Sequence, residues 1–531
     1  MCDLVCWNAN NTDAHESKEN TMHNVLQMLE ATAKRLPNKM AVADPNSELT
    51  FEQLRDTAQR MGTWLVKHGD MRPREAVALY MEKTPLTWAA MLGTVYAGGF
   101  YSAIDVRQPK NRVQSICETL RPAVVLVDAE HEDEAREILG DGSFRLVRIE
   151  ELVDEEADPT TLDAVRAQAT DLDPLYVNFT SGSTGVPKGV MVGHRSTLDF
   201  IADFSDVFGI DETDVIANQA PFDFDVSVKD IYTSLLTGAS MYLVPRAYFS
   251  NPTQLMDYLC SCEATTLTWA VSALCFVTIM GGLDYKVPTS VRRVMFSGEV
   301  MPPKQLAAWQ EHLPQARFVN LYGPTEITCN CTYFEVKRVY EADETIPMGK
   351  PFGNKTVFLL DENDHLVEPS SAGVVGEVCV AGSCLALGYL GDLERTSQAF
   401  VQNPLNTRWR QTIYRTGDLA RYDEDGNLVF SSRKDHQIKH LGQRIEMGDI
   451  EAAANGVNGV EQSCCLYDER RKRLVLCYVG ALDRKGLKEQ LRELLPHFMV
   501  PNNTKQLDEM PLTKNGKIDR AVLASLARIK R

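Results

Sequence analysis

Short apolar runs alternate with amphipathic stretches along most of the chain. Residues 41–44, 76–79, 123–127, 176–180, 241–244 and 294–296 have the length and composition of buried strands. Segments 22–35 and 303–311 have the spacing of amphipathic helices, and Thr50 with Gln53 predicts a capping box at the start of a helix over 51–69. Strands that alternate with helices are typical of α/β layers with mostly parallel strands.

The pattern changes towards the C-terminus, where short strands and helices follow each other closely. Beyond a strand over 426–431, we expect a helix at 448–453, strands at 463–467 and 473–479, and a helix at 485–495. We therefore predict a polar tail (1–21), a large domain of layered sheets (22–434) and a small α+β domain (435–531). The charged segment 431–436 suits the boundary, and it equally suits an ordinary solvated loop.

Composition narrows the classes of function. A chain of 531 residues exceeds one ordinary core, and 44% hydrophobic with 24% charged residues is typical of globular proteins. The net charge of −18 argues against a nucleic-acid partner. None of the 13 cysteines has zinc-site spacing, and the first 22 residues lack a signal peptide. We expect a cytoplasmic protein with reduced thiols.

Two uncharged stretches, 84–104 and 265–283, are long enough to cross a membrane. Both contain Thr, Ser or paired Gly and lack basic flanking clusters. We interpret each as a buried helix that runs into a strand and predict no membrane insertion, with a transmembrane span as the alternative.

A glycine-rich loop follows the strand over 176–180 and reads Ser181-Gly-Ser-Thr-Gly-Val-Pro-Lys-Gly189. Glycines let backbone N–H groups approach an anion, while hydroxyls and Lys188 can donate to phosphate oxygens. The loop differs from the Walker A pattern, because Gly189 follows Lys188 where that pattern needs Ser or Thr. It predicts a phosphate cradle, with a flexible connection as the alternative.

The loop resembles the phosphate loop of the adenylate-forming superfamily, which includes acyl-CoA synthetases, luciferases and adenylation domains of nonribosomal peptide synthetases. Further motifs resemble that family in its own order, at 49–54, 98–105, 322–326, 376–382, 414–419, 433–439, 442–446 and 511–520. The resemblance implies an ATP-dependent ligase that forms an acyl-adenylate and releases pyrophosphate, with a small domain that moves.

The resemblance also implies which residues meet ATP and Mg²⁺. Lys517 would be the catalytic cation between the substrate carboxylate and the α-phosphate, and Glu326 would bind Mg²⁺. The implied nucleotide-binding residues are Thr180, Ser181, Gly182, Ser183, Thr184, Gly185, Lys188, Asn320, Tyr322, Gly323, Thr325, Asp418 and Arg433.

Asp225 points to an amino acid as the substrate, because the amino-acid-activating branch of the family has an aspartate here that pairs with the α-ammonium. The other pocket positions implied are Val226, Lys229, Thr268, Val294, Phe296, Ser297, Leu321, Cys329 and Asn330. Phe296 and Leu321 would shorten the pocket. Lys229 either pairs with an acidic substrate side chain or points away, so small and acidic substrates both remain open.

Several functional alternatives remain open on the residues alone. Segments 224–232 and 296–300 look most like D-alanine–carrier-protein ligases, although Ser297 stands where that group commonly has cysteine. Because the chain ends at Arg531, we expect a freestanding monomer that passes the amino acid to the phosphopantetheine thiol of a separate carrier protein. The small domain would rotate about Asp435, so that Lys517 leaves and the Gly442 segment enters. An acyl- or aryl-CoA synthetase and a degenerate nucleotide-binding scaffold are the rivals.

Overall fold

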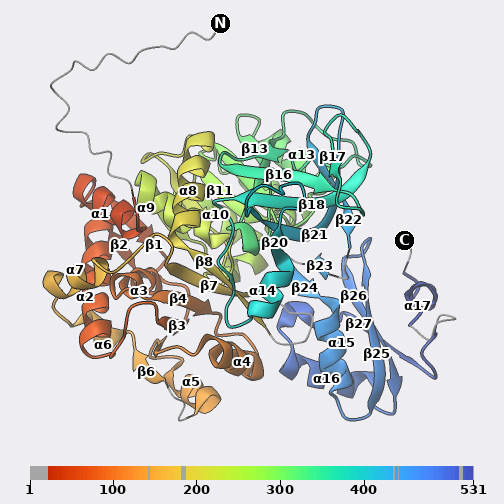
Figure 1. Cartoon of the computed structure of the whole chain (residues 1–531), viewed down its shortest axis with the longest axis horizontal. Coiled ribbons are helices and arrows are strands. Elements are labelled where there is room, and N and C mark those ends of the chain that lie inside the picture. The colour runs from red at the N-terminus through yellow and green to blue at the C-terminus, as the bar shows by residue number, and fades with distance from the viewer. Residues whose placement is uncertain are drawn as a thin grey trace, which may run out of the picture.

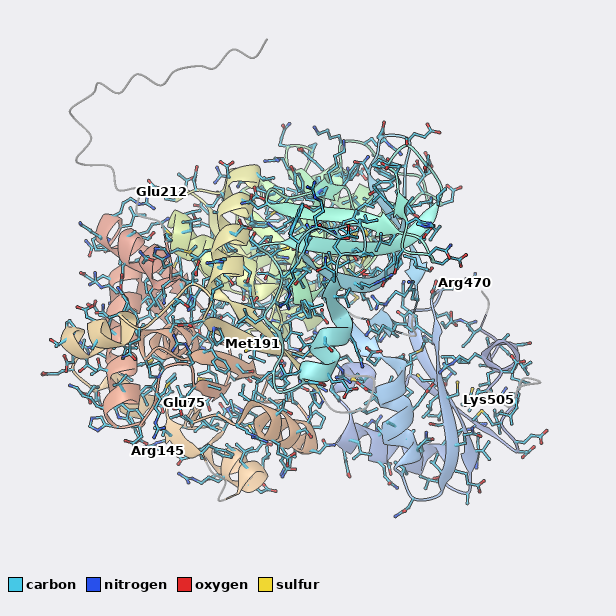
Figure 2. The ribbon with its side chains drawn as sticks, in the orientation of Figure 1. Glu75, Arg145, Met191, Glu212, Arg470 and Lys505 are labelled. Atoms are coloured by element: carbon cyan, nitrogen blue, oxygen red, sulfur yellow. The ribbon has the colours of Figure 1, made fainter. Side chains whose placement is uncertain are left out.

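The computed structural model describes residues 22–140, 144–180, 187–434, 437–440, 442–512 and 518–529. The chain forms a large domain that extends to β22 (Leu428–Arg433) and a small domain that starts at β23 (Gln437–His440) (Figure 1). Side chains fill the space between the ribbons of both domains (Figure 2). The predicted α/β architecture with a large and a small domain is confirmed.

Two sheets with parallel centres form the bulk of the large domain. The first has the order β19 (Gly388–Tyr389), β8 (Lys188–Gly193), β7 (Pro174–Thr180), β4 (Phe100–Ile104), β3 (Ala76–Tyr80), β5 (Val124–Val127), β6 (Arg145–Arg148). The second has the order β15 (Lys350–Pro351), β14 (Thr332–Glu335), β13 (Arg317–Tyr322), β12 (Arg293–Ser297), β11 (Thr266–Ala270), β9 (Val215–Asn218), β10 (Ser240–Leu243), β1 (Met40–Ala43), β2 (Glu48–Thr50).

Helices cover these sheets on both faces, as parallel strands require. One hydrophobic cluster joins the two sheets through α1 (Leu26–Arg35), α2 (Phe51–Lys67), α3 (Pro85–Tyr96), α8 (His194–Phe208) and α9 (Ser227–Thr237). A second cluster covers the other face of β11, β12 and β13 with α10 (Pro252–Ser261), α11 (Val271–Ile279), α12 (Gly282–Tyr285) and α13 (Pro303–His312). The remaining helices of this region are α4 (Lys110–Leu120), α5 (Glu132–Leu139), α6 (Glu150–Val153) and α7 (Pro159–Arg166).

A third sheet of the large domain is antiparallel throughout, which the sequence pattern did not predict. Its order is β17 (Leu366–Val367), β16 (Lys355–Leu360), β18 (Val375–Gly382), β21 (Thr412–Tyr422), β20 (Phe400–Gln402), and β22 also pairs with β21. The helix α14 (Leu393–Ala399) precedes β20, and short 3₁₀ turns elsewhere are η1 (Arg246–Ser250), η2 (Thr325–Ile327) and η3 (His497–Met499).

The small domain combines a hairpin with a three-stranded sheet. β23 pairs with β24 (Gln443–Glu446), and the sheet contains β25 (Val460–Asp468), β26 (Arg473–Gly480) and β27 (Asn503–Leu507). Its core packs α15 (Met447–Asn455) and α16 (Arg484–Leu494) on one face and α17 (Arg520–Leu526) on the other. Figure 1 shows α17 on the side of the sheet away from the large domain, whereas α16 contacts α4.

The structure supports most predicted elements and corrects some. The capping box is present, since the Gln53 amide donates to Thr50 Oγ1 at 3.2 Å and the Thr50 amide donates to Gln53 Oε1 at 2.9 Å. The first helix begins at Leu26 rather than at residue 22. The stretch 84–104 is the expected helix followed by a strand, but 265–283 is a strand followed by a helix, β11 and then α11. No helix among the described residues is long and apolar enough to cross a membrane.

Asp214 ties together the N-terminal ends of three adjacent parallel strands. Its side chain has no exposed surface and accepts from Arg293 Nη1 at 2.7 Å, from Arg292 Nη2 at 2.9 Å and from Thr265 Oγ1 at 2.6 Å. Asp214 precedes β9, Thr265 precedes β11, and Arg293 begins β12. A buried carboxylate with two cationic partners therefore fixes the alignment of these strands.

We predict that Asp214→Ala lowers the free energy of unfolding by about 3–5 kcal/mol, because it leaves Arg293 in the interior without its anion. Urea denaturation measures this loss. Asp206→Ala, at an exposed position of α8, is the matched control and should change stability by less than about 0.5 kcal/mol. Equal effects of the two substitutions would contradict the structural role of Asp214.

Candidate active site

Several predicted site residues lie where strands end at the carboxyl edges of the sheets, which is where open α/β sheets bind ligands. Thr180 ends β7, Ser297 ends β12, and Thr325 follows β13. β7 ends at Thr180, and its cross-strand partner Lys188 begins β8, so the predicted phosphate loop joins two antiparallel neighbours. Within the described residues, the buried Thr180 hydroxyl has no hydrogen-bond partner. Ser181, Gly182, Ser183, Thr184 and Gly185 of the loop lie outside the described residues, as do Lys517 and Asp435.

Glu326 is a fully buried ionisable group of this region. It lies in the 3₁₀ turn η2 directly after β13, and its side chain has no exposed surface. Lys188 Nζ lies 3.1 Å from Glu326 Oε1, and the Tyr389 hydroxyl donates to the same oxygen at 2.9 Å. Although burial alone would raise the pKa of Glu326, the charges of Arg444 and Lys188 hold it well below its ordinary value.

Arg444 reaches this carboxylate from the small domain. It belongs to β24, and its Nη1 lies 2.9 Å from Glu326 Oε2 and 3.1 Å from Oε1. At the tip of the same hairpin, the Gly442 amide donates to Glu299 Oε1 of the large domain at 2.7 Å. The β23–β24 hairpin thus extends into the site and carries a guanidinium to the predicted Mg²⁺ ligand.

A second polar group surrounds Tyr322, the predicted adenine-stacking residue. The buried Tyr322 hydroxyl donates to Asp418 Oδ2 at 2.6 Å, and Arg433 forms an ion pair with the other carboxylate oxygen. Lys439 Nζ, from β23, lies 5.6 Å from the centroid of the Tyr322 ring. Three of the predicted nucleotide-binding residues, Tyr322, Asp418 and Arg433, therefore lie together. The ammonium of Lys439, from the small domain, lies near the Tyr322 ring.

Two further residues that are predicted to bind the nucleotide, Asn320 and Thr325, lie within β13 and in the turn after it. Asn320 is buried and its amide nitrogen donates to the Pro347 carbonyl at 2.7 Å. Thr325 lies beside Asp225 and hydrogen-bonds to it. The turn is strained, because the non-glycine residues Thr328 (φ 57°) and Cys329 (φ 74°) both have left-handed backbone conformations. Strain of this kind persists where the surroundings over-determine the backbone. The two strained residues lie between Glu326 and Asn330.

Asp225 lies between β9 and α9 and is 6% exposed. Burial raises its pKa above the ordinary value, although a hydrogen bond from Thr325 and the charge of Lys229 act against this rise. Lys229 is fully buried in α9 and donates to Asn330 Oδ1 at 2.8 Å. Leu321, Cys329 and Val226 are buried around these groups, and Thr268 and Ser297 lie in the neighbouring strands β11 and β12.

Phe296 and Val294 do not face this group, which corrects their assignment to the substrate pocket. Successive side chains of a strand point to opposite faces, and both residues pack in the cluster beneath α11 and α13. Met295 instead shares the cluster that contains Leu321 and Cys329, and it pairs with Thr268 across the sheet. Met295 is therefore the pocket position that sequence reasoning missed by one residue.

Three further residues of this region were not among the sequence predictions. Tyr389 and Arg444 contact Glu326, and Asp230 accepts from Asn218 Nδ2 at 2.8 Å beside Lys229. Arg444 lies inside the motif at 442–446, so that motif was a usable signal. Asp230 lies inside the segment 224–232, next to Lys229. Tyr389 carries no local signal, because only the packing of distant elements brings it to Glu326.

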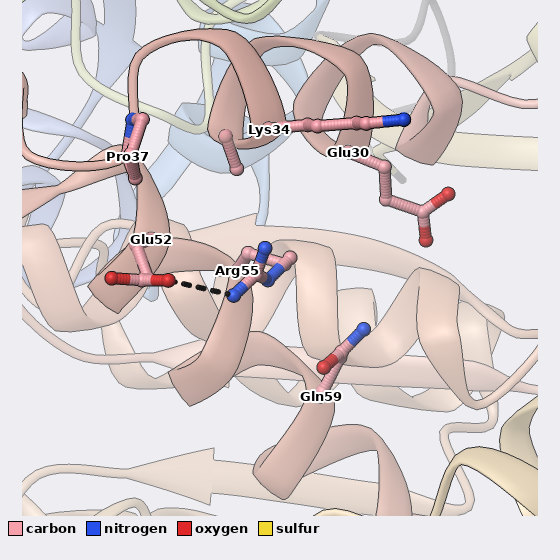
Figure 3. Close-up of a pocket in the computed structure, with 7 residues that line it drawn as sticks. Glu30, Lys34, Pro37, Glu52, Arg55 and Gln59 are labelled. Carbon is pink, nitrogen blue, oxygen red and sulfur yellow. Dashed lines mark hydrogen bonds and ion pairs between the residues drawn. The ribbon is translucent and has the colours of Figure 1, made fainter.

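A hollow on the surface of the large domain does not belong to this site. Figure 3 shows a surface hollow between α1 and α2 that is lined by charged and polar side chains, including the Glu52–Arg55 ion pair. It shares no residue with the Glu326 group.

Among the described residues, no cluster of three or more His, Cys, Asp or Glu side chains could hold a metal by itself.

Together, the fold and the site define a two-domain, nucleotide-using enzyme of the adenylate-forming class. The family model described as AMP-binding enzyme matches residues 29–390, and the model described as AMP-binding enzyme C-terminal domain matches residues 449–517. The chain therefore belongs to the AMP-binding enzyme family, within the adenylate-forming superfamily.

The curated relatives are named as synthases or synthase subunits. One mycosubtilin synthase protein of Bacillus subtilis is 35% identical over 532 residues, which covers 97% of this chain and 20% of that protein. Gramicidin S synthase 1 of Brevibacillus brevis is 31% identical and is matched over 97% of this chain and 45% of its own length. The chain thus spans less than half the length of these two relatives.

Solved structures show the same fold. IdnL1 has a TM-score of 0.78 at 27% identity, over 93% of this chain and 98% of that chain. A four-domain nonribosomal peptide synthetase bound to AMP and glycine has a TM-score of 0.68 at 27% identity, over 94% of this chain and 36% of that chain. A fused adenylation–PCP di-domain protein from Klebsiella oxytoca has a TM-score of 0.78 over 96% of this chain and 98% of that chain, and at 21% identity it shows the fold alone.

The close approach of Gly323 to the strained turn yields a test of the site geometry. A Cβ at Gly323 would lie 2.6 Å from both Asn330 Cα and the Cys329 carbonyl oxygen. Both are backbone atoms, so the backbone of the turn would have to move to make room. We predict that Gly323→Ala lowers stability by about 1–3 kcal/mol and weakens ATP binding, measured by denaturation and calorimetry. Gly456→Ala is the control, since its Cβ would meet nothing closer than 3.5 Å. Unchanged ATP affinity in a folded Gly323→Ala protein would contradict this prediction.

Proposed function

We propose that the chain activates an amino acid as its aminoacyl-adenylate and then transfers the aminoacyl group to the phosphopantetheine thiol of a carrier protein. The observation that carries this proposal is the buried carboxylate of Asp225, next to Thr325 in the turn that bears Glu326. A carboxylate whose pKa is raised by burial is stabilised by an incoming cation. The α-ammonium of an amino acid is such a cation, and it would leave the α-carboxylate close to the nucleotide.

The nucleotide would occupy the region between Tyr322, Asp418 and Lys188. The Tyr322 ring offers a face for adenine, and the Asp418 carboxylate offers lone pairs to ribose hydroxyls. Lys188 and the phosphate loop would hold the leaving phosphates. In the reaction, a carboxylate oxygen of the amino acid bonds to the α-phosphorus, and the bond from that phosphorus to the bridging oxygen breaks to release pyrophosphate. Positive charge from Lys517 would offset the charge that builds up between the reacting anions.

A magnesium ion fits this site once Arg444 has withdrawn from Glu326. Mg²⁺ in nucleotide enzymes usually takes one or two carboxylates together with phosphate oxygens, and the single buried carboxylate of Glu326 meets that need. Both Glu326 oxygens are engaged by Arg444 in this arrangement, so the guanidinium must withdraw before a metal binds. When bound, Mg²⁺ would neutralise phosphate charge.

Transfer of the aminoacyl group to the thiol would use the arrangement in which the β23–β24 hairpin lies in the site. Leu512 and Ile518, which flank the segment containing Lys517, pair with each other, and Ile518 packs on the α17 face of the small-domain sheet. The Gly442 segment instead contacts Glu299. We infer that this arrangement serves transfer, in which a thiol attacks the acyl carbon and AMP leaves. Rotation of the small domain about Asp435 would restore the arrangement for adenylation.

Asp225 favours an amino acid over the fatty or aryl acids of acyl-CoA synthetases, which need no carboxylate at this position. A D-alanine–carrier-protein ligase is a special case of the same proposal. The similar four-domain nonribosomal peptide synthetase, which is bound to AMP and glycine, supports an amino acid as the substrate.

Amino-acid-dependent ATP–pyrophosphate exchange tests the first step directly. We predict that Lys517→Ala lowers the exchange rate by roughly 10²–10³-fold, the scale for loss of one transition-state donor. Asp225→Ala should lower kcat/KM for the amino acid by on the order of 10²-fold or more, because the ammonium loses its buried partner. Lys337→Ala, at an exposed side chain, is the control. Exchange driven by fatty or aryl acids and by no amino acid would overturn the proposed substrate class.

Arg444 allows the two half-reactions to be separated. We predict that Arg444→Ala lowers the Mg²⁺ concentration needed for half-maximal exchange, because the guanidinium no longer competes for Glu326, and that it slows aminoacyl transfer to the carrier thiol. Single-turnover measurements of adenylate formation and of thioester formation report the two effects. Equal losses in both half-reactions, with an unchanged Mg²⁺ requirement, would contradict the role given to the hairpin.

A further inference from the structure

Lys229 forms a buried group of hydrogen-bond donors with Asn330. Its side chain has no exposed surface, and Nζ donates to Asn330 Oδ1 at 2.8 Å. Because an ammonium can only donate, this bond fixes the amide oxygen as the acceptor and turns the amide nitrogen elsewhere. That nitrogen donates to no atom in the part of the chain that the structure describes. The pair therefore offers a positive charge and N–H donors to an acceptor that the described residues do not supply.

The donor group lies within the substrate region and not behind it. Asp225 directly precedes the N-cap of α9, and Lys229 follows four positions later in the first turn, a spacing that brings two side chains to one side of a helix. Cys329 and Asn330 come from the strained turn that also carries Glu326. An amino acid held by its ammonium at Asp225 and by its carboxylate at the nucleotide would direct its side chain among these same residues.

A charge count indicates what that side chain should carry. Burial raises the pKa of Asp230 to about 7 and lowers the pKa of Lys83 to about 7. Asn218 bridges the two, because Lys83 Nζ donates to its Oδ1 at 2.9 Å and its Nδ2 donates to Asp230 Oδ2 at 2.8 Å. As an ion pair or as two neutral groups, Lys83 and Asp230 add no net charge.

Within the large domain, Asp225 and Lys229 then compensate each other before substrate binds; the charge of Lys439, which also acts on Asp225, comes from β23 of the small domain. The α-ammonium of the substrate brings one additional positive charge to Asp225, while its α-carboxylate is directed to the phosphate. A neutral side chain would leave the ammonium of Lys229 without a counter-charge in the interior, and an uncompensated buried charge is costly. An anionic side chain restores neutrality and fills the free donors of Lys229 and Asn330.

We propose that the substrate is an amino acid with an acidic side chain, whose carboxylate accepts hydrogen bonds from Lys229 Nζ and Asn330 Nδ2. This inference rests on the proposed function, since it names the substrate class of the same site. Lys229 then recognises the side chain, whereas Asp225 recognises the ammonium.

ATP–pyrophosphate exchange with matched pairs of amino acids tests the proposal on the wild-type protein. L-Asp is compared with L-Asn, and L-Glu with L-Gln, because each amide removes the charge and keeps the shape; L-Ala, D-Ala and L-Leu complete the set. We expect one acidic amino acid to support exchange with kcat/KM on the order of 10²-fold above that of its amide. An amide or a small neutral amino acid as the preferred substrate would overturn the proposal.

Lys229→Met keeps the apolar stem and removes the ammonium, so it tests the assigned group. We expect kcat/KM for the acidic amino acid to fall on the order of 10²-fold, with little change for the amide and with unchanged ATP affinity. Lys337→Met, at a position 78% exposed, is the matched control and should behave as wild type. Retained preference for the acid in a folded Lys229→Met protein would exclude Lys229 as its partner.

Exchange measurements distinguish a failure of the acidic substrate from a failure of amino-acid activation. Exchange with neutral amino acids alone would refute the acidic substrate and leave amino-acid activation intact. Exchange with none of the amino acids, but with fatty or aryl acids, would refute amino-acid activation and the acidic substrate together. If Lys229→Met did not fold, the wild-type comparison of acid with amide would still decide the outcome.

Discussion

A carboxylate without exposed surface organises the contact between the two domains. Glu326 accepts from Lys188 and Tyr389 of the large domain and from Arg444 of the small domain. In the interior a single carboxylate cannot stay charged without such partners, and removal of one partner would leave a buried charge uncompensated. The position of the β23–β24 hairpin therefore depends on the charge of one side chain that the turn after β13 presents.

That dependence links the resting geometry to the order of the proposed reactions. A guanidinium and a hydrated divalent cation cannot occupy the same carboxylate oxygens, so a metal bound at Glu326 would exclude the hairpin. Phosphates with Mg²⁺ would favour withdrawal of Arg444, and departure of pyrophosphate would favour its return. In the proposed cycle, the differential interaction of Glu326 with the two cations would supply the free energy for a switch between two arrangements.

Compensation of buried charges also governs the proposed substrate region around Asp225 and Lys229. Asp225 and Lys229 compensate each other in the interior, and each is also the natural partner of one end of an amino acid with an acidic side chain. Asp230, Asn218 and Lys83 form a neutral support behind them. Recognition of the substrate would thus replace an internal charge pair with two pairs across the ligand, at constant net charge.

Local patterns in the sequence determined the strands β1, β3, β5, β7, β10 and β12 and the capping box at Thr50, because periodicity and turn chemistry act over a few neighbouring residues. They could not decide the order of strand and helix in 265–283, since an apolar run fits either. They also misplaced Phe296 for Met295, because only the register of β12 against β11 and β13 fixes which face is inside. Tertiary structure alone brought Arg444, Tyr389 and Lys188 to Glu326, since residues from four separate segments meet there and no local rule encodes a long-range charge cluster.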